Sequence, residues 1–128
     1  MNSTPASVPL GLSVGLHRAR IKPGQSAEAD SWMRMLNDRL DESVATLERV
    51  RIGIEIVFRL SDDSGDYLYW VTVRGEGGAS VETSEHQLDE DHLAFDKRVR
   101  EPGWTTGKVE LLLLPDPVRD AVLAWSVK

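Results

Sequence analysis

The sequence predicts one α+β domain, in which two helices cover one face of a four-stranded antiparallel sheet and a short helix follows at the C-terminal end. Its 128 residues suit a single domain. Apolar residues alternate with period two in four short segments, near residues 12–21, 52–60, 67–74 and 108–114. Between the first two segments, and again between the last two, the spacing is helical. The predicted order is therefore β-α-β-β-α-β.

The first predicted helix is the longest element. The first strand ends at Lys22-Pro23-Gly24, which stops an extended segment. Apolar side chains then recur at spacings of three and four, as one face of a helix requires. They are Ala29, Trp32, Met33, Leu36, Leu40, Val44, Leu47 and Val50. A single helix of this length would measure roughly 35–40 Å.

The second half of the chain alternates in the same way. Residues 61–66 are turn residues, so the strands on either side form a hairpin. The segment Gly75–Ser80 is rich in glycine, and we expect a mobile loop that could act as a lid. Asp89 is predicted to cap the second helix, which ends before Pro102-Gly103. Asp116-Pro117 starts the closing helix.

This order matches the ferredoxin-like fold, in which one sheet face has no helices. The apolar set Ile54, Ile56 and Phe58 is expected to face the helices, so Glu55 and Arg59 would point to the open face. We expect the open face to carry enough apolar residues that another surface must shield them from water. The sequence therefore predicts a homodimer, in which two sheets pack through a two-fold axis as a barrel.

Several short motifs add a resemblance to known families. They are Arg20-Ile21-Lys22-Pro23-Gly24, Trp32, Arg39, Glu55 with Phe58, Tyr67-Leu68-Tyr69 and His92 with Phe95. On these, most of Leu16 to Leu114 resembles a family of small bacterial domains of unknown function. The arrangement is similar to the dimeric α/β-barrel superfamily, which includes the antibiotic-biosynthesis monooxygenases. The resemblance implies ligands between sheet and helices, or inside the barrel.

Composition excludes several classes of function. A net charge of −6 disfavours nucleic acid and anionic membrane surfaces as partners. The chain has no cysteine, and its three histidines lack metal-ligand spacing, so no metal and no cofactor are predicted. Residues 1–10 have the composition of a flexible tail, residues 11–128 form the domain, and no apolar run spans a membrane. We expect a cytoplasmic protein.

Two residues are candidates for catalysis. His92, in the first turn of its helix, could serve as a general base, or it could be a core histidine bonded to the backbone. Glu55 could accept a proton, or it could pair across the sheet with an arginine. Tyr69, Arg20 and Arg59 are the predicted substrate-binding residues.

These residues favour a small-molecule-binding protein or a cofactor-independent enzyme of the monooxygenase or isomerase kind, with a pocket between sheet and helices. The alternative is a dimeric ligand-binding, stress-response or interaction module without catalysis. The fold does not choose between them, because one scaffold can host unrelated activities.

Overall fold

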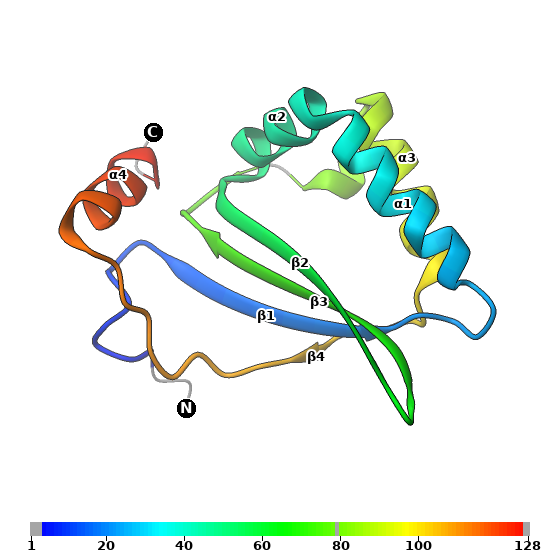
Figure 1. Ribbon diagram of the computed structural model, residues 1–128. Helices are drawn as coiled ribbons and strands as arrows, with labels where there is room; N and C mark the ends of the chain where they lie inside the picture. Colours follow the sequence, from blue (N-terminus) through cyan, green and yellow to red (C-terminus); the bar gives the residue numbers. More distant parts are fainter. Residues whose placement is uncertain (1–3, 79, 127–128) are drawn as a thin grey trace.

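The structure is a computed structural model that describes residues 4–78 and 80–126. Helices α1–α3 lie together above one face of a sheet, and α4 stands apart at one end (Figure 1). The elements are β1 (Ser13–Arg20), α1 (Ser26–Asp38), α2 (Leu40–Val50), β2 (Ile52–Asp62), β3 (Gly65–Arg74), the short 3-10 helix η1 (Val81–Thr83), α3 (Gln87–Val99), β4 (Thr105–Thr106) and α4 (Asp116–Ser126).

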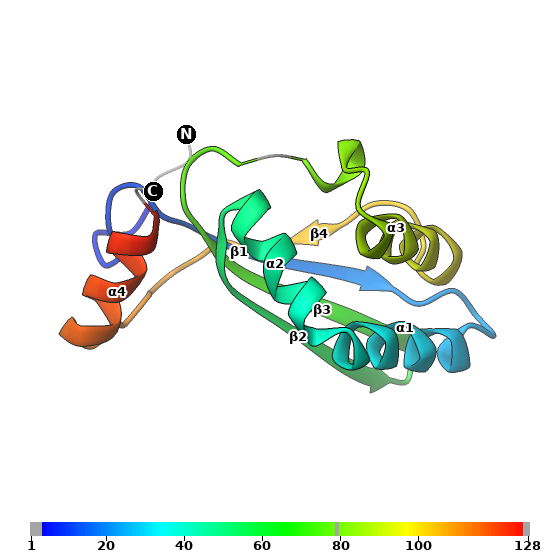
Figure 2. The ribbon, with the colours of Figure 1, turned by 90° about the horizontal axis from the view of Figure 1, so that it is seen from above.

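The four strands lie in the order β2-β3-β1-β4, and each neighbouring pair is antiparallel. This is the order that a βαββαβ chain adopts in a ferredoxin-like sheet, so the predicted fold class is confirmed. The sheet is open, with β2 and β4 at its edges. Seen from above, α1, α2 and α3 cover the sheet, while α4 lies beyond its end (Figure 2).

The main core lies between the helices and the sheet. Trp32 of α1, Leu68 of β3 and Val99 of α3 are fully buried there, and Trp70 is nearly so. The Trp32 and Trp70 rings lie 5.4 Å apart, so the two indoles join helix to sheet. Burying one large aromatic side chain stabilises the folded state by about 1.5–3 kcal/mol. The Trp32–Trp70 pair therefore anchors α1 on the sheet.

The face assignment of β2 was wrong. Ile56 and Phe58 lie on the open face, where they are 43% and 55% exposed. Ile54 packs near the end of that face against a second apolar cluster, which includes Val8 and Leu112. Glu55 and Arg59 instead point toward the helices, because Glu55 bonds to Trp70 and Arg59 forms a 2.5 Å ion pair with Asp30 of α1. The polar residues could turn inward because each finds a partner there.

The predicted long helix is two helices. Arg39 leaves the helical conformation, with φ −109° and ψ 51°, between α1 and α2. The hydroxyl of Ser43 donates to the carbonyl oxygens of Leu36 (2.9 Å) and Arg39 (3.0 Å), which satisfies groups that the break exposes. Neither Pro nor Gly marks the position, so the apolar stripe alone could not reveal it.

The predicted strand at 108–114 is also wrong. The fourth strand is only Thr105–Thr106, and the chain leaves the sheet after the amide of Gly107 donates to the Leu16 carbonyl at 2.8 Å. Leu112 then packs into a second apolar cluster near α4, and its amide donates to Ser7 Oγ at 3.0 Å. Val8, within the segment predicted as a tail, is buried in the same cluster.

Candidate functional site

A cavity of about 960 Å³ lies between the three covering helices and strands β2 and β3. Its wall is mainly apolar. The apolar residues that line it include Met33 and Leu36 of α1, Leu40, Val44, Leu47 and Val50 of α2, Val57 of β2 and Leu88 of α3. A cavity of this size and character is typical of small-molecule sites.

Among the polar residues of this wall, Glu55 and His92 are each positioned by a tryptophan. The indole Nε1–H of Trp32 donates to Nδ1 of His92 at 2.9 Å. The indole Nε1–H of Trp70 donates to Oε1 of Glu55 in a short hydrogen bond. Glu55 and His92 both line the cavity. Sequence analysis proposed this pair, and the structure brings the two residues to one site.

His92 is held in its neutral form. Burial is the largest influence and lowers the pKa of His92, and the Arg100 charge lowers it further. The carboxylates of Asp96, Glu55 and Asp89 oppose this shift but do not reverse it. The imidazole is therefore uncharged at neutral pH and takes part in hydrogen bonds rather than ion pairs.

A buried carboxylate, that of Asp89, joins α2 to α3 in the cavity wall. Asp89 was predicted to cap α3, but the N-cap position is His86 and Asp89 lies in the first turn, only 2% exposed. It accepts hydrogen bonds from Thr46 Oγ1 at 2.8 Å and from Arg49 Nη2 at 3.0 Å. Burial raises the pKa of Asp89, but hydrogen bonds from Ser84, Thr46 and Arg49 outweigh it and lower the pKa overall.

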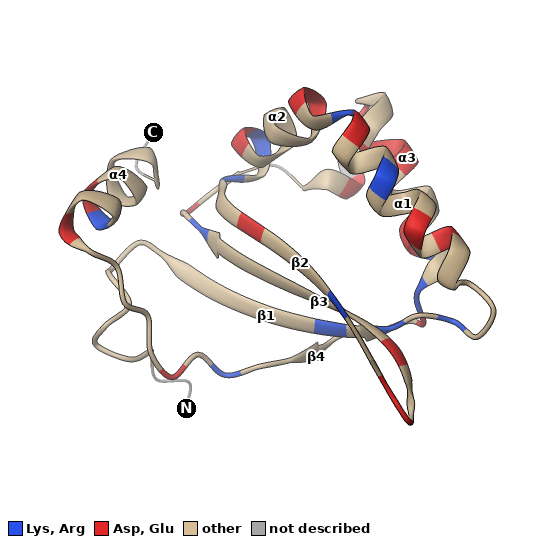
Figure 3. Cartoon of the chain, in the orientation of Figure 1, with Lys and Arg blue, Asp and Glu red and all other residues tan. Residues whose placement is uncertain are grey.

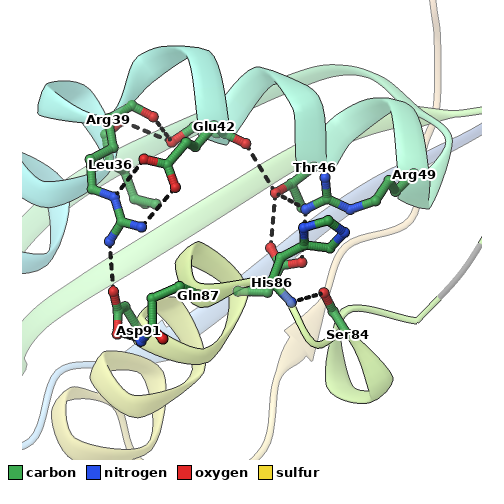
Figure 4. Close-up of polar contacts among 11 residues, drawn as sticks. Leu36, Arg39, Glu42, Thr46, Arg49, Ser84, His86, Gln87 and Asp91 are labelled. Carbon is green, nitrogen blue, oxygen red and sulfur yellow. Dashed lines mark hydrogen bonds and ion pairs between the residues drawn. The ribbon is translucent and has the colours of Figure 1, made fainter.

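Arg39 ties the junction of α1 and α2 to α3. Its Nη1 lies 2.6 Å from Asp91 Oδ2, and its Nη2 lies 2.7 Å from Glu42 Oε2 (Figure 4). The hydrogen bonds that Arg39 donates to Glu42 and Asp91 raise its pKa, and Arg39 in turn lowers the pKa of both carboxyls. The Arg39–Asp91 ion pair and the Asp89 contacts thus link the α1–α2 junction and α2 to α3.

The glycine-rich loop reaches the cavity at Gly78 and Ser80. Gly78 has φ +97°, and a Cβ there would lie 2.7 Å from the Val50 backbone, so the position requires glycine. Ala79 lies outside the described residues. The lid role of this loop stays a prediction.

The predicted substrate-binding residues do not line this cavity. Tyr69 pairs with Phe58 on the open face of the sheet. Arg20 reaches the hairpin, where its Nη2 donates to the Ser64 carbonyl at 2.8 Å. Arg59 is engaged by Asp30. The three residues predicted to bind substrate therefore lie outside the cavity that Glu55 and His92 line.

Sequence analysis missed the cavity wall contributed by α2. Leu40 and Val44 were assigned to a helix stripe packed on the sheet, yet they are 59% and 50% exposed at the cavity rim. The charged residues around Arg39 were the available signal for the break. The apolar side chains of a helix that continues past the sheet need another surface to contact, and here they line the cavity.

Over the part of the chain that the structure describes, no group of three or more His, Asp or Glu residues is placed to hold a metal ion. Within the same residues, every helix is too short or too polar to cross a bilayer.

Comparison with known families gives one match, to a family of unknown function (DUF6176), over residues 12–120. The chain belongs to this family. The matched range includes every strand, the cavity and both tryptophan-held residues. A search of the curated proteins finds no match. Membership in the family specifies no reaction, so the relation in fold to antibiotic-biosynthesis monooxygenases stays a prediction.

Proposed function

We propose that the protein binds a small organic molecule in the cavity between its helices and its sheet. The observation that carries the proposal is the pair of polar side chains, Glu55 and His92, each fixed by a tryptophan N–H in a mainly apolar wall. An apolar cavity with a few oriented polar groups is the general form of a small-molecule site. The ligand would have an apolar body and one polar end.

The same pair supports an enzyme over a passive binder. Burying a glutamate and a histidine costs free energy that an apolar wall would not. Among the described residues, neither Glu55 nor His92 forms an ion pair with a basic residue, and the hydrogen bond to each comes from a tryptophan. Groups kept at such a cost are characteristic of active sites.

The variant Val44→Trp tests the binding proposal. Val44 is half-exposed at the cavity rim, so an indole there should fill the entrance without disturbing the core. Native mass spectrometry of protein purified without added ligand should show an adduct on the wild-type chain. We expect the dissociation constant of Val44→Trp to rise by at least about tenfold, a loss of about 1.4 kcal/mol in binding free energy, so that little adduct remains.

Glu48→Trp is the matched control, because Glu48 is exposed on the same helix and does not line the cavity. It should keep the adduct in full. An adduct retained by Val44→Trp, or lost equally from both variants, would contradict binding in this cavity.

We also propose that a second copy of the chain covers the open face of the sheet. Three cross-strand rows on this face place exposed apolar residues of β2 beside residues of β3, namely Ile56 with Val71, Phe58 with Tyr69 and Leu60 with Tyr67. Acidic residues gather on the helices and at the hairpin end (Figure 3), and the acidic residue in the middle of β2, Glu55, faces the helices. A two-fold axis would pack the apolar patch of one copy against the same patch of the other copy.

The segment after β4 favours the same assembly. Residues 108–114 have a strand-forming sequence, yet they pair with no strand among the described residues. Leu111 and Leu113 are 64% and 75% exposed on either side of half-buried Leu112. Such a segment would gain apolar contacts and hydrogen-bond partners in a dimer.

Phe58→Glu should dissociate this dimer. A charge placed at the centre of an apolar two-fold contact meets its own copy, so both desolvation and repulsion oppose association. We expect light scattering to show two chains for the wild type and one for the variant. Ala94→Glu, on the exposed surface of α3, should remain dimeric. A monomeric wild type would contradict the proposal.

A further inference from the structure

The hydrogen bond from Trp32 determines what His92 can do. An indole N–H only donates, so Nδ1 of His92 must accept and carries no proton. A neutral imidazole then has its proton on Nε2. With Nδ1 occupied by Trp32, His92 presents to a ligand an N–H donor and not a base.

Glu55 offers the complementary group. Its Oε1 accepts from Trp70, while Oε2 has no hydrogen bond to any described residue. The Trp70 ring lies 5.4 Å from Trp32 and 5.9 Å from His92, centre to centre, so one aromatic cluster positions both polar groups. The aromatic cluster thus holds one oriented acceptor, Glu55, and one oriented donor, His92, at the cavity.

We propose that the cavity catalyses enolisation of a carbonyl compound with an apolar body, with Glu55 as the base and the Nε2–H of His92 as the donor to the carbonyl oxygen. This inference rests on the proposed function and names its substrate class. It reverses the role predicted for His92 from the sequence.

The reaction balances without a cofactor. Glu55 takes the proton from the carbon next to the carbonyl, and the C–H electron pair forms a carbon–carbon double bond. The carbonyl π electrons move to oxygen, where the His92 N–H stabilises the developing charge. Return of the proton from Glu55 to the same carbon restores the substrate, and its return to another carbon of a conjugated substrate gives an isomer.

A neutral histidine suits this task. A donor positioned before the reaction stabilises the enolate more than water would, because the apolar wall lowers the local dielectric. A protonated imidazole would need a proton on Nδ1 and would lose the Trp32 bond. Of the charged groups around His92, the Asp96, Glu55 and Asp89 carboxylates raise its pKa and the Arg100 guanidinium lowers it.

Deuterium exchange tests the inference, with β-tetralone and phenylacetone as probes. In D₂O, proton NMR should show that the wild type accelerates loss of the signal from the carbon next to the carbonyl. Glu55→Gln should reduce the catalysed rate by at least about 100-fold, the usual minimum for removing a general base. Glu110→Gln, an exposed change outside the cavity, should match the wild type.

His92→Asn separates catalysis from structure. The asparagine Oδ1 can take the place of Nδ1 and accept from Trp32, but no donor reaches the position of Nε2. We expect about 100-fold slower exchange, the typical effect of losing one oxyanion donor, with the melting temperature preserved. A purely structural histidine would give the opposite pattern, a lower melting temperature and an unchanged rate relative to Glu110→Gln.

Two results would overturn the inference, and they differ in what they leave standing. If the probes shift the Trp32 and Trp70 indole signals but exchange no faster than with Glu55→Gln, the reaction is wrong and ligand binding stands. If neither probe binds, the carbonyl class is wrong, and the adduct experiment with Val44→Trp still decides the proposed function separately.

Discussion

Replacing Trp32 with alanine should lower the free energy of unfolding by about 3–5 kcal/mol, the range for deleting a large buried aromatic side chain. Trp32 has no exposed surface, and its ring packs on Trp70, His92 and Phe95. Its deletion leaves a void under α1 and removes the donor that positions His92. Urea unfolding monitored by far-ultraviolet circular dichroism measures the change.

Trp104→Ala is the control for this prediction. Trp104 is 38% exposed and contacts the same cluster only at the edge of Trp70, 6.1 Å between ring centres. We expect its loss to cost less than half as much as the loss of Trp32. Equal losses for the two variants would mean that the aromatic cluster does not hold α1 on the sheet.

Replacing Asp89 with alanine should have the next largest effect. Removing one partner of a buried ion pair typically costs about 3–5 kcal/mol. Arg49 is 30% exposed, so water can solvate its guanidinium after the change, and we expect about 2–3 kcal/mol. Chemical denaturation at pH 7 measures it, with Asp41→Ala on the exposed side of α2 as the control. A loss no greater than the control's would contradict the linking role of Asp89.

The contribution of Asp89 should depend on pH in a defined direction. Its pKa is lowered in the folded state, so the folded chain holds its proton less tightly than the unfolded chain does. The carboxylate therefore stabilises the fold in full above the unfolded pKa of about 3.9, and this contribution is lost as pH falls through the lower folded pKa. Asp89→Asn should differ from the wild type at pH 7, and the difference should shrink as the pH falls below the unfolded pKa of about 3.9. A constant difference would contradict the assignment.

The fold was predictable because local signals agreed with one another. Strand alternation, the stop at Lys22-Pro23-Gly24 and the hairpin turn each predict the observed elements and their order. The face of β2 was not predictable by the same reasoning. The rule that the more apolar side faces the helices fails for Ile56 and Phe58, because Glu55 and Arg59 find polar partners beneath the helices.

The candidate site was predictable only in part. Glu55 and His92 could be singled out as polar residues in apolar surroundings, but nothing in their spacing shows that Trp70 and Trp32 bind them. The cavity itself depends on the break at Arg39, which is stabilised by Asp91, a residue 52 positions away. Contacts so distant in sequence leave no periodic pattern to read.

The most direct test of the account is an NMR titration of the four indole N–H groups with a library of small apolar carbonyl compounds. Trp32 and Trp70 donate to the two site residues, whereas Trp125 packs on Arg51 and does not line the cavity. Binding in the cavity should shift the Trp32 and Trp70 signals together in the wild type, leave Trp125 unchanged, and disappear in Val44→Trp. Shifts confined to Trp125, or shifts that survive Val44→Trp, would contradict a ligand site between the helices and the sheet.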